Sequence, residues 1–230
     1  VDNNHVIFAN FCWRIVRTTE TGGVKLIYDG VPSNGQCNNT GSSSAIGSSA
    51  FNSSTDDVKY VGYMYGSSID DTSNTTDSTI KEVIDNWYKT NMTNYTLQLE
   101  DTVFCNDRSY TTSGSYLKFA GYTRLWYNHQ PTLKCKNTKD KFTVETSNGN
   151  GALTYPVGLI TVDETAYAGG VSNISNNAFY LYIGQWFWAL SPSDFTDLIA
   201  NGFALTSNGG FSHSNVTSSR WVRPVLSLKS

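Results

Sequence analysis

Apolar residues in this 230-residue chain recur mostly at every second position, in short runs separated by Gly, Ser and Asn. The opening segment HVIFANFCWRIVRTTETGGVKLIYDG predicts a β-hairpin that turns at residues 19–23. The segment GFALTSNGGFSHS predicts a second hairpin, which turns at residues 208–210. Further strand-like segments are VKYVGYMYG (58–66), TVFCNDRSY (102–110), YLKFAGYTRLWY (116–127), KFTVET (141–146), AFYLYIGQWFWALS (178–191) and RWVRPVLSL (220–228). This pattern restricts the chain to a sheet-rich fold.

One long segment, DSTIKEVIDNWYKTNM, has helical spacing instead. Thr79 and Glu82 have the spacing of a capping box, which predicts Thr79 as the N-terminal cap of this helix. The apolar residues on one helical face follow the i, i+3, i+4, i+7 pattern at Ile80, Val83, Ile84 and Trp87.

A second, shorter helix is predicted in LITVDETAYAGG. Thr161 can cap it, Glu164 completes the capping box, and Gly169 supplies the stop. Two short helices among many strands predict an α+β fold with mixed or antiparallel sheets and long loops.

The chain is long enough to bury a core, since 39% of its residues are hydrophobic, and we expect residues 1–230 to form a single domain. No apolar run approaches the roughly 20 residues that cross a bilayer. The sequence begins with Val1 rather than Met. We therefore expect an ectodomain without direct membrane insertion, with any signal or anchor outside this sequence.

Four cysteines, Cys12, Cys37, Cys105 and Cys135, form two close pairs along the sequence. Of the three possible connectivities, we favour the local pairs Cys12 with Cys37 and Cys105 with Cys135, each stabilising by about 3 kcal/mol. The alternative is four reduced cysteines in a cytosolic core. No CxxC spacing is present, so the sequence lacks the pattern of zinc sites.

The charge of the chain argues against polyanionic partners. Its formal net charge is −3, which gives no long-range attraction to nucleic acid or to an anionic bilayer. Only 15% of the residues are charged, so the surface must consist largely of Asn, Ser, Thr, Gly and Tyr. Such a surface is typical of extracellular proteins.

Motifs for catalysis or metal binding are missing from the sequence. His5, His129 and His213 lie far apart, and no serine occurs in GxSxG. Adjacent Asp163 and Glu164 point in different directions on a helix, which argues against a glycosidase pair. We expect no metal, no cofactor and no enzymatic activity.

A calcium loop is a minor alternative for the segment SSIDDTSNTTDS. Asp71, Ser73, Thr75 and Asp77 occupy every second position there. A calcium loop also needs a glycine at its bend and a Glu at its end, and both are missing. A solvated loop is the simpler interpretation.

Two segments carry a resemblance to known proteins. LITVDETAYAGG combines a hydrophobic entry, a capped short helix and a Gly-Gly exit, and the chain ends with WVRPVLSL. Together they resemble the fold shared by formylglycine-generating enzymes and the C-type lectin-like variable proteins of bacteria and phage. The resemblance implies a C-type lectin-like domain in which Arg223 is a buried arginine of the last strand.

A second resemblance concerns the C-terminal third. FWALSP and VRPVLSL bracket the second predicted hairpin, and this arrangement is similar to a domain of gut Firmicutes surface proteins or pilin-like proteins, in which comparable motifs bracket a changeable insert. FCWRIVRTTETGGVKLIYDG resembles the first hairpin of that domain. Residues 191–220 contain no Lys, Glu, Gln, Met or Trp, a composition also expected of proteins diversified by a retroelement.

These resemblances imply a rigid scaffold that presents residues 194–219. Trp186, Trp188 and Trp221 would form the floor and walls beneath this surface. Phe195, Phe203, Leu205 and Phe211 are expected to face inward, with Phe195 or Phe211 as an exposed anchor in the alternative. The expected ligand-binding residues are Asp194, Phe195, Thr196, Asp197, Asn201, Thr206, Asn208, Ser212, His213, Ser214 and Asn215.

Family activities do not transfer to this chain. The enzymes of this fold need a cysteine pair in the C-terminal part, and no cysteine follows Cys135. The calcium-binding motifs EPN, QPD and WND of C-type lectins are also missing.

We therefore expect a non-catalytic surface-display or adhesion domain, located outside the cell, on a cell surface or on a phage particle. Its partner would be a protein or a glycan. The alternative is a structural subunit of a pilus, fibre or surface layer that binds copies of itself. An extracellular hydrolase is the least favoured hypothesis, and it would require His213 within hydrogen-bond reach of a serine and a carboxylate.

Overall fold

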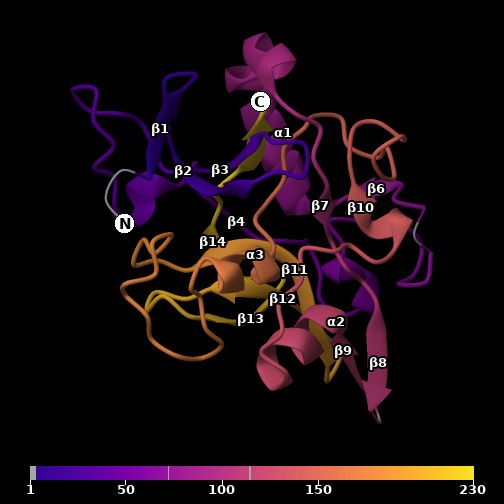
Figure 1. Ribbon diagram of the computed structural model, residues 1–230. Helices are drawn as coiled ribbons and strands as arrows, with labels where there is room; N and C mark the ends of the chain where they lie inside the picture. The colour runs from indigo at the N-terminus through magenta and orange to yellow at the C-terminus, as the bar shows by residue number, and fades with distance from the viewer. Residues whose placement is uncertain (1–3, 72, 114) are drawn as a thin grey trace.

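The computed structural model describes residues 4–71, 73–113 and 115–230 (Figure 1). The predicted α+β class is confirmed, because the described residues form mostly strands with a few short helices. Figure 1 shows β1, β2 and β3 near α1 in the upper half and β11, β12 and β13 in the lower half. One hydrophobic cluster contains residues of both sheets and of α1, including Leu26, Ile84 and Trp188.

The smaller of the two main sheets joins the beginning and the end of the chain. Its strands follow the order β1-β2-β3-β15 and are antiparallel. The first predicted hairpin is confirmed, since Thr19 N donates to Gly23 O at 2.8 Å. The strands are β1 (His5–Phe8), β2 (Phe11–Thr18), β3 (Val24–Tyr28) and β15 (Val225–Leu228).

The larger sheet contains the second predicted hairpin, β12–β13, which is also confirmed. Its order is β13-β12-β11-β14-β4, with β9 beside one end of β11 and β8 beside β9. The strand β14 is parallel to β11. The strands are β4 (Ser48–Ser49), β8 (Tyr110–Ser113), β9 (Tyr116–Phe119), β11 (Phe187–Thr196), β12 (Ile199–Leu205), β13 (Phe211–Asn215) and β14 (Arg220–Trp221).

Two small strand pairs and several single-turn helices complete the described part. The strand β5 (Met64–Tyr65) pairs with β6 (Thr76–Asp77), and β7 (Phe104–Cys105) pairs with β10 (Lys141–Phe142). The 3-10 helices are η1 (Gly41–Ser44), η2 (Val58–Val61), η3 (Thr93–Gln98) and η5 (Thr138–Asp140).

Several strand predictions need correction. Residues 102–110 and 141–146 contain little strand beyond the short β7 and β10. Residues 220–228, predicted as one final strand, form β14 in the larger sheet and β15 in the smaller sheet. Residues 58–66 begin with η2 before the short strand β5, and β11 begins only at Phe187, after a turn region. Residues 120–127 are helical, as α2 (Ala120–Tyr122) and the π-helix η4 (Thr123–Tyr127). The physical reason is aromatic packing, because a helical turn stacks the rings of Tyr122 and Trp126 at 5.0 Å.

Both predicted helices form. The helix α1 (Thr79–Asn91) begins one residue earlier than expected, because Ser78 rather than Thr79 is the cap, and its hydroxyl accepts from Lys81 N. The helix α3 (Val162–Tyr167) has the predicted Thr161–Glu164 capping box. Gly169 then adopts a φ of +105°, which suits a residue without a side chain at the end of a helix.

The predicted disulfides are confirmed as Cys12–Cys37 and Cys105–Cys135, with a Cα–Cα distance of 5.6 Å in each. Both bridges are of the kind that persists in oxidising environments. Among the described residues, no helix has the length and apolar character that crossing a membrane requires.

Candidate functional site

The predicted ligand-binding residues differ widely in their access to solvent. The exposed members of the set are Asp197, Asn208 and His213. The partly buried members are Phe195, Thr196, Ser212 and Asn215. The buried members are Asp194, Asn201, Thr206 and Ser214.

The prediction of ligand contact is wrong for the four buried side chains, because the protein already binds them internally. Asp194 accepts hydrogen bonds from Ser193 Oγ at 2.7 Å and from Asn201 Nδ2 at 2.9 Å. Thr206 Oγ1 donates to a backbone carbonyl, and Ser214 Oγ accepts from an arginine. All residues of β12 after the first are buried. The alternation of polar and apolar residues along this strand therefore does not mark one face exposed to solvent and one buried face.

The inward orientation of Phe203, Leu205 and Phe211 is confirmed, since all three are buried. The alternative role of Phe211 as an exposed anchor is therefore wrong. Phe195 is partly buried and packs against the hydrophobic core. It thus has only part of its ring available to a ligand.

The three tryptophans differ in their position relative to the hairpin. Trp188 is fully buried, lies opposite Ala204 of β12 and donates from Nε1 to Ser49 O at 2.9 Å, so it forms the predicted floor. Trp221 belongs to β14, which lies on the other side of β11 from the hairpin. Trp186 is partly buried beneath the guanidinium of Arg220. Arg220 Nε also donates to Ser214 Oγ of β13 at 3.1 Å, which links Trp186 to the hairpin through Arg220. The role of Trp186 and Trp221 as walls stays a prediction.

The expected burial of Arg223 is confirmed. Its guanidinium donates to Tyr28 O at 2.9 Å, to Leu181 O at 2.8 Å and to Asp29 Oδ1 at 2.8 Å. Burial lowers the pKa of Arg223 to about 10, and the charge remains because Asp29 opposes it. Arg223 thereby ties the segment just before β15 to the end of β3 and to Leu181.

One end of the larger sheet exposes large side chains from several segments. We define the tyrosine patch as Tyr116, Lys118, Tyr127, Leu198 and His213. The pairing of Phe195 with Leu117 and of Asp194 with Lys118 places β9 beside the end of β11. Figure 1 shows β8, β9 and α2 near β11 and β12 in the lower half.

Contacts inside the tyrosine patch hold its side chains in place. Lys118 Nζ donates to the hydroxyl of Tyr127 at 2.5 Å, and this bond lowers the pKa of Tyr127 and raises the pKa of Lys118. The ring of Trp126 lies between those of Tyr122 and His213, nearly parallel to both. Tyr127 is nevertheless 55% exposed. Lys118, Tyr127 and His213 are therefore held by contacts, and Tyr127 remains accessible.

The turn at the end of the β11–β12 hairpin is strained. Asp197 and Leu198 connect the paired residues Thr196 and Ile199, with φ angles of +51° and +61°. Such angles suit glycine or asparagine, whereas a leucine there costs about 1–2 kcal/mol. Leu198 is also 71% exposed, so it gains little from burial. Strain of this kind is found at functional positions.

His213 does not form a catalytic triad with its neighbours. Its Nδ1 lies 3.8 Å from Asp194 Oδ2, which is beyond hydrogen-bond distance. Ser193 Oγ donates to the same carboxylate rather than to the imidazole. In a triad the imidazole lies between serine and carboxylate, so this arrangement does not activate Ser193.

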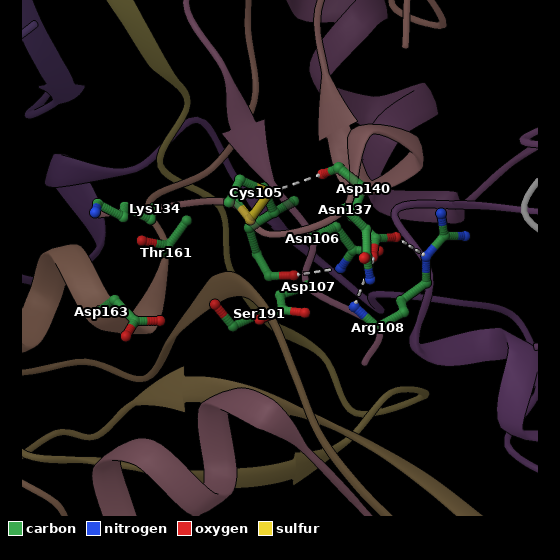
Figure 2. Close-up of a disulfide and its surroundings, with 12 residues drawn as sticks. Cys105, Asn106, Asp107, Arg108, Lys134, Asn137, Asp140, Thr161, Asp163 and Ser191 are labelled. Atoms are coloured by element: carbon green, nitrogen blue, oxygen red, sulfur yellow. Dashed lines mark hydrogen bonds and ion pairs between the residues drawn. A yellow bond between two sulfur atoms is a disulfide. The ribbon is translucent and has the colours of Figure 1, made fainter. Parts of the chain in front are cut away.

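A cavity of about 620 Å³ lies beside the Cys105–Cys135 disulfide, in a place that the sequence did not indicate. Figure 2 shows Lys134 near this disulfide, with Thr161, Asp163 and Ser191 around it. The volume lies in the range of small-molecule sites, about 300–1,000 Å³. The walls come from segments far apart in sequence, so no local motif marks them.

Buried carboxylates form the floor of this cavity, and arginines and a lysine neutralise them. Arg124 donates to Asp107 at 2.9 Å and to Asp163 at 2.8 and 3.0 Å. Burial alone lowers the pKa of Arg124, but the two carboxylates raise it above its usual value. Arg124, Asp107 and Asp163 are thus held in ion pairs with one another.

Glu164 completes the floor and combines two structural roles. It accepts from Lys25 Nζ at 2.7 Å and from Arg17 Nε at 3.0 Å while also capping α3 through Thr161. Burial raises its pKa, but Lys25, Thr161 N and Arg17 together lower it below its usual value. Glu164 is therefore ionised and committed to the fold.

The segment SSIDDTSNTTDS, the minor alternative for a calcium loop, contains hydrogen bonds between its own residues. Asp71 accepts from Ser67 N at 2.7 Å, from Ser67 Oγ at 2.8 Å and from Ser73 N at 3.1 Å. The bonds from Ser67 and Ser73 lower the pKa of Asp71. In the part of the chain that the structure describes, no three His, Cys, Asp or Glu side chains are grouped so as to hold a metal ion.

Comparison with known proteins found no relative of this chain. No protein-family model matches this chain, and no curated protein and no solved structure matches it either.

Proposed function

We propose that this chain is a non-catalytic binding domain of a protein displayed outside the cell, on a cell surface or on a phage particle. Its tyrosine patch contacts a protein or glycan ligand. The single observation that carries this proposal is the accessible patch at the end of the larger sheet, where Tyr127 and the strained Leu198 are exposed. Two disulfides are compatible with a secreted protein.

The composition of the patch supports a binding role. Exposed tyrosines supply large contact area at a low cost in side-chain entropy, and they combine apolar rings with hydroxyl groups. Lys118 adds a cationic group bonded to Tyr127, and His213 adds a polar ring stacked on Trp126. Binding energy in interfaces is concentrated in a few side chains, among which tyrosine is enriched.

The scaffold in this proposal is a C-type lectin-like fold. The capping box of α3 and the buried Arg223 before β15 agree with the two motifs that carry the resemblance. The proposed ligand surface is one end of the sheet rather than the whole C-terminal hairpin, because Asp194, Asn201, Thr206 and Ser214 are buried.

The test measures binding of the purified chain to a glycan array and to immobilised mucin, collagen and fibronectin. The expected result is saturable binding that Leu198→Ser and Tyr127→Ala each weaken tenfold or more. The control variants are Leu97→Ser and Tyr167→Ala, which alter exposed side chains elsewhere on the molecule. If no probe binds, or if patch and control variants weaken binding equally, the proposal is wrong.

A structural subunit is the second candidate, and one specific observation favours it. All residues of β8 (Tyr110–Ser113) are exposed, and β8 pairs only with β9 among the described strands. An unpaired strand edge can accept a strand from another copy of the chain. Sedimentation at increasing concentration would then show growing assemblies that Thr112→Pro disrupts, whereas a display domain would remain a monomer or small oligomer.

A further inference from the structure

The cavity beside the Cys105–Cys135 disulfide contains charged groups that the fold leaves unpaired. Lys134 and Lys141 both line it. Within residues 4–71, 73–113 and 115–230, neither ammonium group has a hydrogen-bond or ion-pair partner. Lys134 precedes Cys135 in sequence and Lys141 lies opposite Cys105 in the β10–β7 pair, so both cations belong to the disulfide side of the cavity.

Two carboxylates in the same cavity have no cation beside them. Glu100 accepts one hydrogen bond, from Thr19 Oγ1 at 2.8 Å. Asp101 accepts from the backbone N–H groups of Val144 and Glu145, each at 2.8 Å. Asn148 Nδ2 also donates to Asp101, at 3.4 Å. No Lys, Arg or His among the described residues forms an ion pair with Glu100 or Asp101, so only neutral hydrogen-bond donors contact these two carboxylates within the protein.

These unpaired groups differ from the floor of the cavity. Arg124 and Glu164 are already committed to internal ion pairs, and a ligand would have to break those pairs to bind there. Lys134, Lys141 and Glu100 can each form a charge-assisted hydrogen bond without any such loss. The cavity therefore selects a ligand that brings both a negative and a positive group.

The other residues that line the cavity restrict the class of ligand that can bind. No aromatic ring lines the cavity among the described residues, which removes the stacking surface that sugars and nucleobases use. Val103, Leu133 and the disulfide supply a limited apolar wall. A small zwitterion with a short apolar part satisfies all of these features.

We propose that this cavity is a second binding site, independent of the tyrosine patch, for a free amino acid or a short peptide with both ends free. The carboxylate end binds Lys134 and Lys141, and the amino end binds Glu100 and Asp101. The ion pairs of Arg124 and Glu164 in the floor keep the cavity open and give it a defined shape.

The test is calorimetric titration of the full chain with trialanine and with three blocked forms, N-acetyl-trialanine, trialanine amide and the doubly blocked peptide. Trialanine is expected to bind best, and each blocked end is expected to weaken binding about tenfold, as the loss of one charge-assisted hydrogen bond implies. Equal binding of the free and the blocked peptides would overturn the proposal. So would the absence of binding at millimolar peptide.

Variants test which cavity residues bind the carboxylate end and which bind the amino end of the peptide. Lys134→Gln and Lys141→Gln are expected to abolish the difference between trialanine and its amide, and Glu100→Gln the difference between trialanine and its acetylated form. The matched controls Lys136→Gln and Glu145→Gln, outside the cavity, are expected to keep both differences. If the controls behave like the cavity variants, the site is wrongly placed.

The two proposals can fail separately. Leu198→Ser alters the tyrosine patch and is expected to leave trialanine binding unchanged. Lys134→Gln is expected to leave binding to immobilised ligands unchanged. Loss of trialanine binding in Leu198→Ser would show that the cavity is not an independent site.

Discussion

Arg223 Nη2 donates to Asp29 Oδ1 at 2.8 Å, and both side chains are completely inaccessible to solvent. Asp29 also accepts from Arg14 Nε at 2.8 Å. This pair joins residues 194 positions apart and connects the segment just before β15 to the residue that follows β3. A buried pair of this kind is costly to break, because the remaining partner keeps its charge without compensation.

Arg223→Met is therefore expected to lower the free energy of unfolding by about 3 kcal/mol. Arg220→Met is the control, since Arg220 is only partly buried and stacks on Trp186 at 4.6 Å. The control should lose about 1 kcal/mol at most. Urea unfolding followed by tryptophan fluorescence measures both values. Equal losses in the two variants would show that the Asp29 pair has no special role.

Stability is expected to fall in acid because of Glu164. Its pKa is lowered in the folded protein, so its contribution is present above its unfolded-state pKa and is lost as the pH falls through the folded pKa. Glu164→Gln should be less stable at pH 7, and its difference from the unmodified chain should shrink below about pH 4. Urea unfolding between pH 7 and pH 3 measures this difference, and a pH-independent difference would contradict the prediction.

Tyr63→Phe is expected to raise stability. The Tyr63 hydroxyl is buried and has no hydrogen-bond partner among the described residues, and such a group costs about 1 kcal/mol or more. Burial also raises the pKa of Tyr63 well above its usual value. The matched control is Tyr88→Phe, which removes a hydroxyl bonded to Thr96 Oγ1 at 2.8 Å and should lower stability. Thermal unfolding should move in opposite directions for the two variants.

Leu198→Gly is expected to stabilise the chain by about 1 kcal/mol, because glycine adopts the positive φ of this turn without steric cost. Ile199→Gly, one residue later in β12, should destabilise, since glycine in a strand loses more conformational entropy. Urea unfolding decides the sign, and a destabilised Leu198→Gly would contradict the prediction.

Replacing Cys105 and Cys135 by serine is expected to reduce the free energy of unfolding by about 3–4 kcal/mol, because the bridge closes a loop across a sequence separation of 30 residues. The loop containing Leu133 and Lys134 should then be cleaved faster by trypsin. The control is the same digestion of the unmodified chain without reductant. Unchanged cleavage at Lys134 would show that the bridge does not hold this wall of the cavity.

Several local features followed from the sequence alone. The hairpin at residues 19–23, the hairpin at residues 208–210 and the capping box of Thr161 with Glu164 are set by interactions between residues close in sequence. The disulfide pairs also followed from short loop closure. Local propensity, turn residues and spacing carry this information because the interacting groups are only a few positions apart.

Other local predictions failed where tertiary packing outweighed the alternation of apolar residues. Residues 120–127 looked like a strand but form a helix, because Trp126 packs between Tyr122 and His213 of a distant strand. The polar residues of β12 looked exposed but are buried, because neighbouring strands and segments cover both faces of that strand. Pattern alone does not reveal how many faces of a strand are covered.

The candidate sites depended almost entirely on the tertiary structure. The sequence determined the scaffold class, the covalent bridges and the absence of common catalytic motifs. Only the folded chain brought Lys134, Lys141 and Glu100 to one cavity, and Tyr127, Leu198 and His213 to one end of a sheet. The physical reason is that these groups interact across long sequence separations, so their meeting is fixed by strand order and burial rather than by spacing along the chain.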